Sequence, residues 1–246
     1  MSTPEATSGR SSRLGQGALA LSVVAIAVSI VIGILEQLGV GLGEPGAVAP
    51  GLSQQIIDVA VTHEDWYLRY GRWIDLTSAV AFAGILVAIP FVRGTRRALH
   101  VLIAGGTLAI AGEVIDLSQL GGIDLARWTL ESGLAADFTA ANTYRYAING
   151  TASFVWSAGL FLTSVGIFIV ANDADDRRWK ALNALFAVSL LGTGVADLSG
   201  SLLWLDIVSY AMAALALVWI TLALGRLDDR SVLGPPGEPR LEPAHP

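Results

Sequence analysis

The sequence ALHVLIAGGTLAIAGEVIDLSQLGG, residues 98–122, decides the fold. A helix that crosses the roughly 30 Å hydrocarbon core of a membrane needs about 20 mostly apolar residues. This stretch supplies them, and it carries Glu113 and Asp116 toward one end. At about 1.5 Å per residue, Glu113 lies roughly 22 Å from the start of such a helix and Asp116 roughly 27 Å. We therefore predict a membrane-spanning helix with one carboxyl group inside the apolar layer and a second near its border, on the same face.

The chain as a whole has the composition of an integral membrane protein. Of its 246 residues, 53% are hydrophobic and 15% are charged, against about 25% charged residues in ordinary soluble domains. The sequence contains no Cys, which excludes a disulfide, a thiolate metal site and a thiol nucleophile. It also lacks a phosphate-binding glycine loop, an HExxH motif and a nucleophile elbow, and it has no basic patch for nucleic acid. We therefore expect neither an enzyme nor a nucleic-acid partner.

The apolar stretches predict an all-α fold, a polytopic bundle of six transmembrane helices in a lipid bilayer. The expected spans are residues 17–38, 73–92, 98–120, 147–171, 181–201 and 202–224. Two more segments, residues 52–70 and 123–138, are amphipathic but too polar to cross, so we expect outer interfacial helices there. The membrane domain then covers residues 15–225, between disordered tails at 1–14 and 226–246.

Aromatic side chains gather near the outer ends of the expected spans, where they are typical of the membrane interface. We expect them to anchor the bundle in the bilayer; they are Trp66, Tyr67, Tyr70, Trp73, Trp128, Tyr144, Tyr146 and Trp204.

The distribution of basic residues predicts the orientation of the bundle. With six spans and the N-terminus inside, 11 of the 15 Lys and Arg residues fall on the inner side. The four on the outer side are Arg69, Arg72, Arg127 and Arg145. This satisfies the positive-inside rule, so we expect both termini in the cytoplasm of a bacterial-type cell and the protein in its cytoplasmic (inner) membrane. The same assignment places 13 of the 21 acidic residues outside, where they would attract cations.

The two halves of the chain resemble each other. Residues 116–118 and 197–199 both read Asp-Leu-Ser, 81 positions apart, and the Arg-Arg pairs at 96–97 and 177–178 have the same offset. We predict a parallel repeat of two helices with units near 52–121 and 123–201, an arrangement that often places a site at the repeat interface in transporters. Duplication of a bundle with no transport role is the alternative. Glu113 breaks the symmetry, because its counterpart is Gly194.

Several segments of the chain are similar to a known family. The runs RYGRWIDLTSAVAFAGILVAIPFV, IDLARWTLESGLAADF and RYAINGTASFVWSAGLFL, with the Arg turn and the long third span between them, resemble the membrane domain of the copper-resistance D (CopD) family. The resemblance covers roughly residues 52–170. Those proteins are bacterial inner-membrane proteins implicated in copper uptake. The resemblance thus implies copper or other metal handling.

The residues themselves offer few ligands for copper. Cu(I) prefers thiolate and thioether sulfur, but the chain has no Cys and its only Met residues are Met1 and Met212. Of the three His residues, only His63 is expected outside. Two interpretations of His63 are open: an imidazole ligand of a metal, with Glu64 or Asp65 beside it, or an ordinary solvated side chain. Carboxylate oxygens suit harder cations instead.

Two hypotheses about function remain open, beside a third option, a membrane enzyme that acts at the outer leaflet. The first is a protein that binds or transports a cation, either a metal ion or a proton, through an acidic site in the outer half of the bundle. Its candidate ligands are Glu113, Asp116, Asp197, Glu36, Asp75 and His63, with Asp206 at the mouth. A metal cation is the one cofactor we consider. The second is a non-transporting subunit or scaffold, in which Arg69 and Arg145 neutralise the acids and a partner membrane protein or a second copy covers the bundle.

Overall fold

The protein is an all-α helical bundle, as predicted. The computed structural model describes residues 5–38, 65–200 and 202–227. Within them, six helices are long and apolar enough to cross a membrane. The spans run through α1 (Glu5–Gln37), α3 (Arg72–Ala88) with the short helices at its two ends, α4 (Leu99–Leu117) with its continuation to Thr129, α6 (Ala135–Asn172), α7 (Arg177–Ser199) and α8 (Leu202–Leu224).

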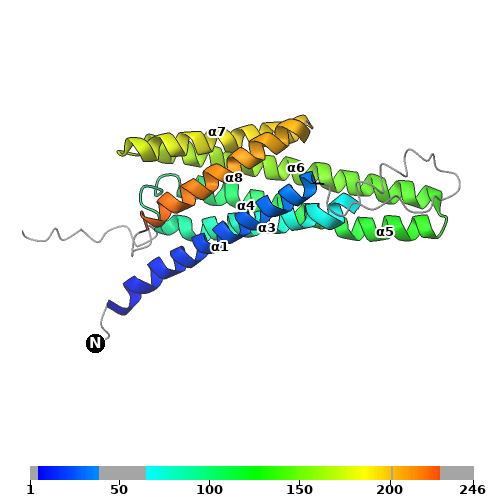
Figure 1. Ribbon diagram of the computed structural model, residues 1–246, viewed down its shortest axis with the longest axis horizontal. Coiled ribbons are helices and arrows are strands. Elements are labelled where there is room, and N and C mark those ends of the chain that lie inside the picture. The colour runs from blue at the N-terminus through cyan, green and yellow to red at the C-terminus, as the bar shows by residue number, and fades with distance from the viewer. Residues whose placement is uncertain (1–4, 39–64, 201, 228–246) are drawn as a thin grey trace, which may run out of the picture.

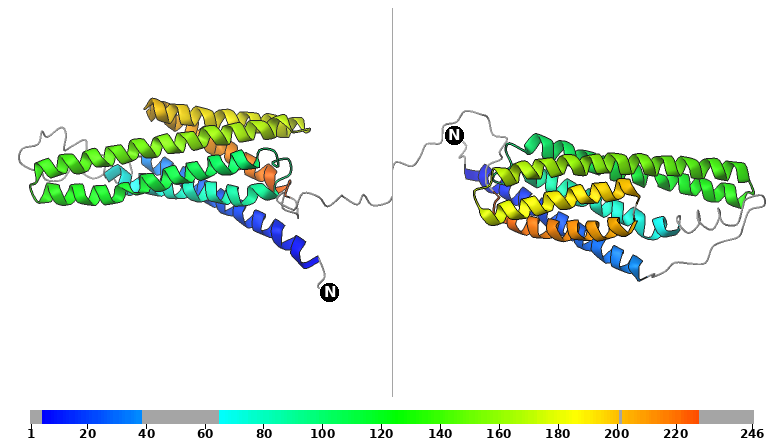
Figure 2. Two further views of the ribbon diagram at one scale, coloured as in Figure 1. Left: turned by 180° about the vertical axis from the view of Figure 1, so that it is seen from behind. Right: turned by 90° about the horizontal axis from the view of Figure 1, so that it is seen from above.

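The six helices form a closed ring. Each packs against the next in chain order, and α8 returns to contact α1. Figures 1 and 2 show them running along the long axis of the molecule, with α1 crossing the others at an angle. Tyr210 of α8 lies so close to α1 that a methyl group added to Gly33 would stand 2.4 Å from its hydroxyl oxygen. A ring of this kind can enclose a cavity within the bundle.

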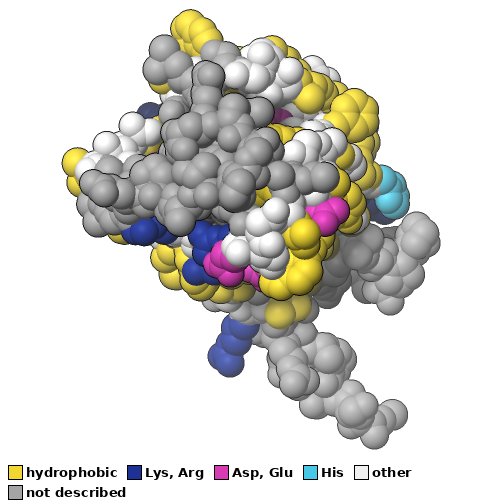
Figure 3. Space-filling view, turned by 90° about the vertical axis from the view of Figure 1, so that its right-hand side faces the viewer, with side chains coloured by type: hydrophobic (Ala, Val, Ile, Leu, Met, Phe, Trp, Pro, Cys, Tyr) yellow, Lys and Arg dark blue, Asp and Glu magenta, His cyan; other side chains and the backbone are white. Residues whose placement is uncertain are grey.

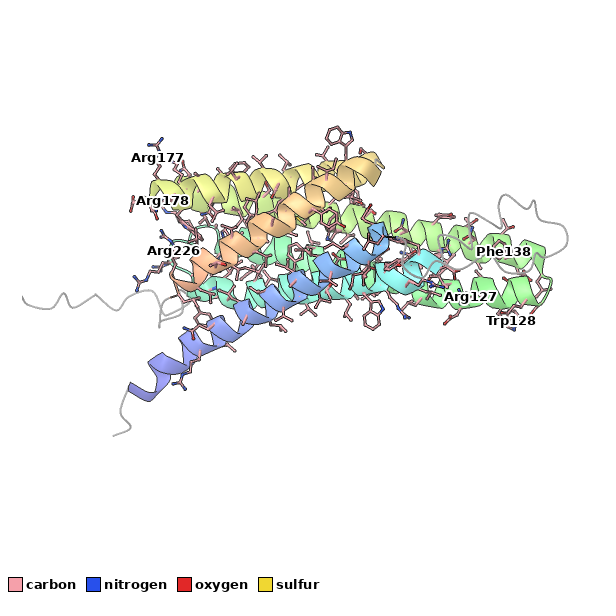
Figure 4. The ribbon with its side chains drawn as sticks, viewed as in Figure 1. Arg127, Trp128, Phe138, Arg177, Arg178 and Arg226 are labelled. Carbon is pink, nitrogen blue, oxygen red and sulfur yellow. The ribbon has the colours of Figure 1, made fainter. Side chains whose placement is uncertain are left out.

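The basic side chains gather at one end of the ring, which we call the basic end. Figure 4 places Arg177, Arg178 and Arg226 there, and Arg127 at the opposite end. The start of α1 and the last described residues also lie at the basic end, where the amide of Arg93 donates to the carbonyl of Arg226 over 3.0 Å. Figure 3 looks onto the opposite end, where acidic and basic side chains lie among exposed hydrophobic ones.

Glycines bring α4 and α6 into backbone contact. A Cβ added to Gly159 would lie 2.3 Å from the backbone nitrogen of Ala109, and one on Gly105 would lie 2.5 Å from that of Thr163. A Cβ on Gly112 would lie 2.6 Å from the Cβ of Trp156. Small residues allow this approach, and tight packing of this kind drives association of helices in lipid, where no hydrophobic force acts between them. We call this contact the glycine seam.

The segment after α4 differs from the expected interfacial helix. Helix α5 (Gln119–Glu131) follows α4 in nearly the same direction and packs against the first half of α6. The 38 residues of α6 span about 57 Å, so the two helices project as a hairpin beyond the rest of the bundle (Figures 1 and 2). Ile123 and Ala126 face inward, while Leu125 and Trp128 are exposed. The segment is amphipathic as predicted, and α6 packs against its buried side. Its position at the membrane interface stays a prediction.

Helix ends and aromatic positions depart from prediction in two places. Helix α1 begins at Glu5, inside the expected disordered tail, since extending an existing helix costs far less than starting one. Tyr67 and Tyr70 lie in a π-helix, η1 (Tyr67–Gly71), and are buried rather than anchored in lipid. Pro90 lies in a short 3₁₀-helix, η2 (Ile89–Phe91). Most of the expected helix at 52–70 and of the C-terminal tail lies outside the described residues.

The glycine seam should be intolerant of even one methyl group. We expect Gly159→Ala to lower the free energy of unfolding by about 1–3 kcal/mol, because the new Cβ forces α4 and α6 apart. Gly150→Ala on the same helix is the matched control, since nothing lies within 4 Å of its added Cβ and alanine favours the helix. Unfolding of both variants in mild detergent measures the difference. Equal stability of the two would contradict the close contact.

Candidate functional site

A cavity of about 320 Å³ lies inside the ring. All six spanning helices contribute to its wall. Five carboxyl groups line it: Glu36, Asp75, Glu113, Asp116 and Asp197. The rest of the wall mixes small polar residues with aromatic and aliphatic ones, including Ser29, Ser78, Asn149, Ser153, Ser209, Trp66, Trp156, Tyr210, Ile30, Ile74 and Leu205.

Helical spacing explains how so many acids reach one space. Glu113 and Asp116 are three residues apart on α4, and residues at that spacing share one face of a helix. Asp75 and Ser78 have the same spacing on α3, and all four line the cavity. Glu113 and Asp75 are the most buried of the five acids, with 7% and 9% of their surface exposed. The polar faces of the helices thus turn inward, away from lipid.

Each carboxyl group accepts a hydrogen bond from a neutral donor. Within the bundle, the hydroxyl of Ser78 on α3 donates to Glu113 on α4. In the second half of the chain, Ser157 on α6 donates to Asp197 on α7 over 2.8 Å. In both helix pairs a serine on the first helix donates to a carboxyl group on the second. The two acceptors, Glu113 and Asp197, are not at equivalent positions of the predicted repeat, which pairs Glu113 with Gly194.

The acids nearer the rim are held in the same way. The indole nitrogen of Trp66 donates to Glu36 over 2.6 Å, and the side-chain amide of Gln119 donates to Asp116. Neutral donors fix the orientation of a carboxylate without cancelling its charge.

Tyr67 connects two of the acids. Its hydroxyl oxygen lies 2.8 Å from Oδ2 of Asp75 and 2.9 Å from the backbone carbonyl oxygen of Asp116. A hydroxyl has one proton to donate, so it serves both acceptors fully only if Asp75 itself carries a proton and donates it to Tyr67. The geometry therefore offers a place for one proton at Asp75.

No basic side chain neutralises these acids within the described part of the chain. The ion pairs in this part of the chain lie elsewhere and join Arg97 to Asp173, Arg127 to Asp65, and Arg226 to Asp176, at 3.2, 2.9 and 2.5 Å. Arg145, expected as a counter-ion, is buried but pairs with none of the cavity acids. Among the described residues, therefore, arginines do not pair with the cavity acids as the second hypothesis expects.

The cavity acids influence one another but do not form a metal cluster. Asp75 experiences the charges of Glu113 and Asp116, and Glu113 that of Asp197. In a medium of low dielectric constant such like charges repel strongly. Among the described residues, however, no three His, Asp or Glu side chains come close enough to hold one metal ion. The arrangement favours positive charge throughout the cavity rather than at a single multidentate site.

The structure brings five of the six predicted ligands to one cavity. The sixth, His63, lies outside the described residues, as does the side chain of Asp206. We did not predict from the sequence that the hydroxyl groups of Tyr67, Ser78 and Ser157 donate to these acids. Serines are common in membrane helices, and only the spacing of Ser78 from Asp75 hinted at a role. Tyr67 was assigned to the membrane interface, although it precedes Asp75 by eight residues, about two helical turns.

No protein-family model, curated protein or solved structure matches the chain. The resemblance to the CopD family therefore stays a prediction, and function has to be argued from the cavity.

The link between Tyr67 and the acids should contribute to stability. We expect Tyr67→Phe to lower the free energy of unfolding by about 1–3 kcal/mol, because it leaves buried acceptors without their donor. Tyr144→Phe is the control: that residue is 62% exposed, and removal of its hydroxyl should change stability by less than about 0.5 kcal/mol. Denaturant titration of both variants would measure this, and a neutral effect at Tyr67 would contradict the network.

Proposed function

We propose that this protein binds a cation in its acidic cavity and moves it across part of the membrane. The single observation that carries the proposal is that five carboxyl groups line one cavity without a basic counter-ion among the described residues. An ionisable group at membrane depth costs at least a few kcal/mol and is usually found where it serves a substrate or ion pathway. A scaffold would gain nothing from leaving these groups unpaired.

Of the possible cations, the proton best fits the carboxyl and hydroxyl groups that line the cavity. The carboxyl groups are spread around the wall rather than gathered about one point. Beside them lie the hydroxyl groups of Tyr67, Ser78 and Ser157, which can each donate and accept a hydrogen bond and so pass a proton onward. A hard metal ion would need several oxygen ligands at about 2.3–2.6 Å, which the described acids do not offer together.

The position of the cavity supports an outward-facing site. Glu36 lies in the last turn of α1, and Asp116 and Asp197 lie near the ends of α4 and α7 that are remote from the basic end. If the basic end faces the cytoplasm, as the positive-inside rule predicts, the acids occupy the outer half of the bundle. We infer that cations enter from the outer face of a bacterial inner membrane.

Flux through Glu113 tests the proposal. Protein reconstituted into vesicles containing a pH-sensitive dye should acidify or alkalinise the interior when a proton gradient is applied. We expect Glu113→Gln to reduce this flux to the level of empty vesicles, since the amide keeps the shape of the side chain but binds no proton.

The control variant is Asp173→Asn, which removes the surface partner of Arg97 far from the cavity and should leave the flux unchanged. Undiminished flux in Glu113→Gln would overturn the assignment. Flux of a metal ion but not of protons would support the acidic cavity as the path and show that the transported cation is a metal ion.

A further inference from the structure

The most deeply buried arginine of the described chain lacks a counter-ion. Arg145 on α6 is 1% exposed, and its Nε and Nη2 atoms are buried with no hydrogen-bond partner. By contrast, the side chains of Arg97, Arg127 and Arg226 are 80%, 43% and 32% exposed, and each pairs with an aspartate. Exposed pairs are worth little, whereas a buried unpaired charge costs several kcal/mol. Among the described residues, therefore, no anion compensates the most deeply buried guanidinium.

Arg145 belongs to a buried polar cluster between α5 and α6. Its Cβ lies 3.6 Å from the position of a Cβ added to Gly122 on α5. On the same face of α6, three residues earlier, Asn142 has an unpartnered carbonyl oxygen, and so has Gln119 across the interface. Gln119 approaches Asn149, one turn after Arg145, over 3.4 Å. Of the six buried unpartnered polar atoms in the described residues, four belong to this cluster.

The two free donors of Arg145 have the geometry for an oxyanion. Nε and Nη2 lie on the same edge of the planar guanidinium, and their N–H bonds point in parallel. This edge grips two oxygens of a carboxylate or phosphate at once. The neighbouring ring of Tyr146, 5.4 Å from the guanidinium carbon, gives a cation–π contact that cannot replace an anion.

We propose that Arg145 is the recognition residue of an oxyanion site between α5 and α6, which adjoins the acidic cavity at Gln119 and Asn149. A bound phosphate or carboxylate would accept both N–H groups of Arg145, and its hydroxyl group or a water carried with it would donate to Gln119 and Asn142. Because the guanidinium is almost fully buried, α5 must move away from α6 for the anion to exchange. The site needs no charge from the cavity acids and stands whether or not the protein transports cations.

The depth of the cluster indicates where the anion could come from. From Leu99, at the basic end of α4, to Gln119 is 20 residues, or about 30 Å of helix, the thickness of the hydrocarbon layer. Arg145 therefore lies near the level of the lipid phosphates on the side away from the basic end. A lipid headgroup and a free oxyanion in the adjoining water present the same chemistry to it.

Thermal unfolding of the whole protein in a neutral detergent tests the site. The probe is sodium phosphate, compared with sodium chloride at the same ionic strength, because chloride does not offer the two separate oxygens that match the parallel N–H groups. We expect phosphate to raise the unfolding temperature of the wild type and of Arg72→Met, the control. Arg72 also has an unpartnered Nε and lies over an aromatic ring, 5.1 Å away.

Arg145→Met should lose the phosphate response and, without phosphate, unfold at the same or a higher temperature than the wild type. A purely structural arginine would behave differently: its loss would lower the unfolding temperature equally in both salts. Arg145→Lys keeps the charge but lacks the two-pronged edge, and it should bind phosphate about tenfold more weakly. If Arg145→Met does not fold, the lysine variant decides the matter.

Native mass spectrometry separates the two sources of the anion. Phospholipid retained by the wild type and lost in Arg145→Met or Arg145→Lys identifies a lipid headgroup. A phosphate response with no retained lipid identifies a free oxyanion. If neither lipid nor phosphate depends on Arg145, the site does not exist.

Discussion

The close approach of α4 and α6 determines the rest of the structure. Gly105 and Gly159 let the two backbones touch at points where a single methyl group would collide with main-chain atoms. In lipid, such contact replaces the hydrophobic force that joins helices in water. Because α4 carries Glu113 and α6 carries Trp156, the distance between these helices also decides the width of the cavity. The remaining helices complete the ring around this fixed pair.

The ring concentrates charge in an unusual way. Its basic residues lie mostly at one end, where they are exposed or paired with aspartates. The cavity acids accept hydrogen bonds from hydroxyl, indole and amide groups, and among the described residues none of them pairs with a basic side chain. Such donors hold a carboxylate in place and leave its charge for a mobile cation. The opposite arrangement occurs one helical turn beyond the cavity, where Arg145 is buried without an anion. The cavity acids and Arg145 therefore both carry charge that no oppositely charged side chain among the described residues neutralises.

Much of the fold follows from hydropathy alone, because a membrane allows few solutions. The last predicted span, residues 202–224, coincides with α8. The acids were predicted at one depth, and they line one cavity because they lie on the inward faces of their helices. The errors come from contacts between elements that no single segment reveals. The segment predicted as one helix at 123–138 belongs to two helices, because its first part lies in α5, its last residues begin α6, and α5 packs against α6. Tyr67 looked like an anchor because its acceptor lies on the next helix.

The negative potential of the cavity can be measured directly, because the natural chain has no Cys. A single cysteine introduced as Ser209→Cys, on the cavity wall, would be labelled with a cationic and an anionic thiol reagent of equal size. Asn172→Cys, exposed at the basic end, provides the comparison. We expect the cationic reagent to react faster than the anionic one at position 209 and to lose this advantage when Glu113→Gln and Asp197→Asn are added. Equal rates for the two reagents at position 209 would mean that the acids are already neutralised, and would contradict a negatively charged cavity.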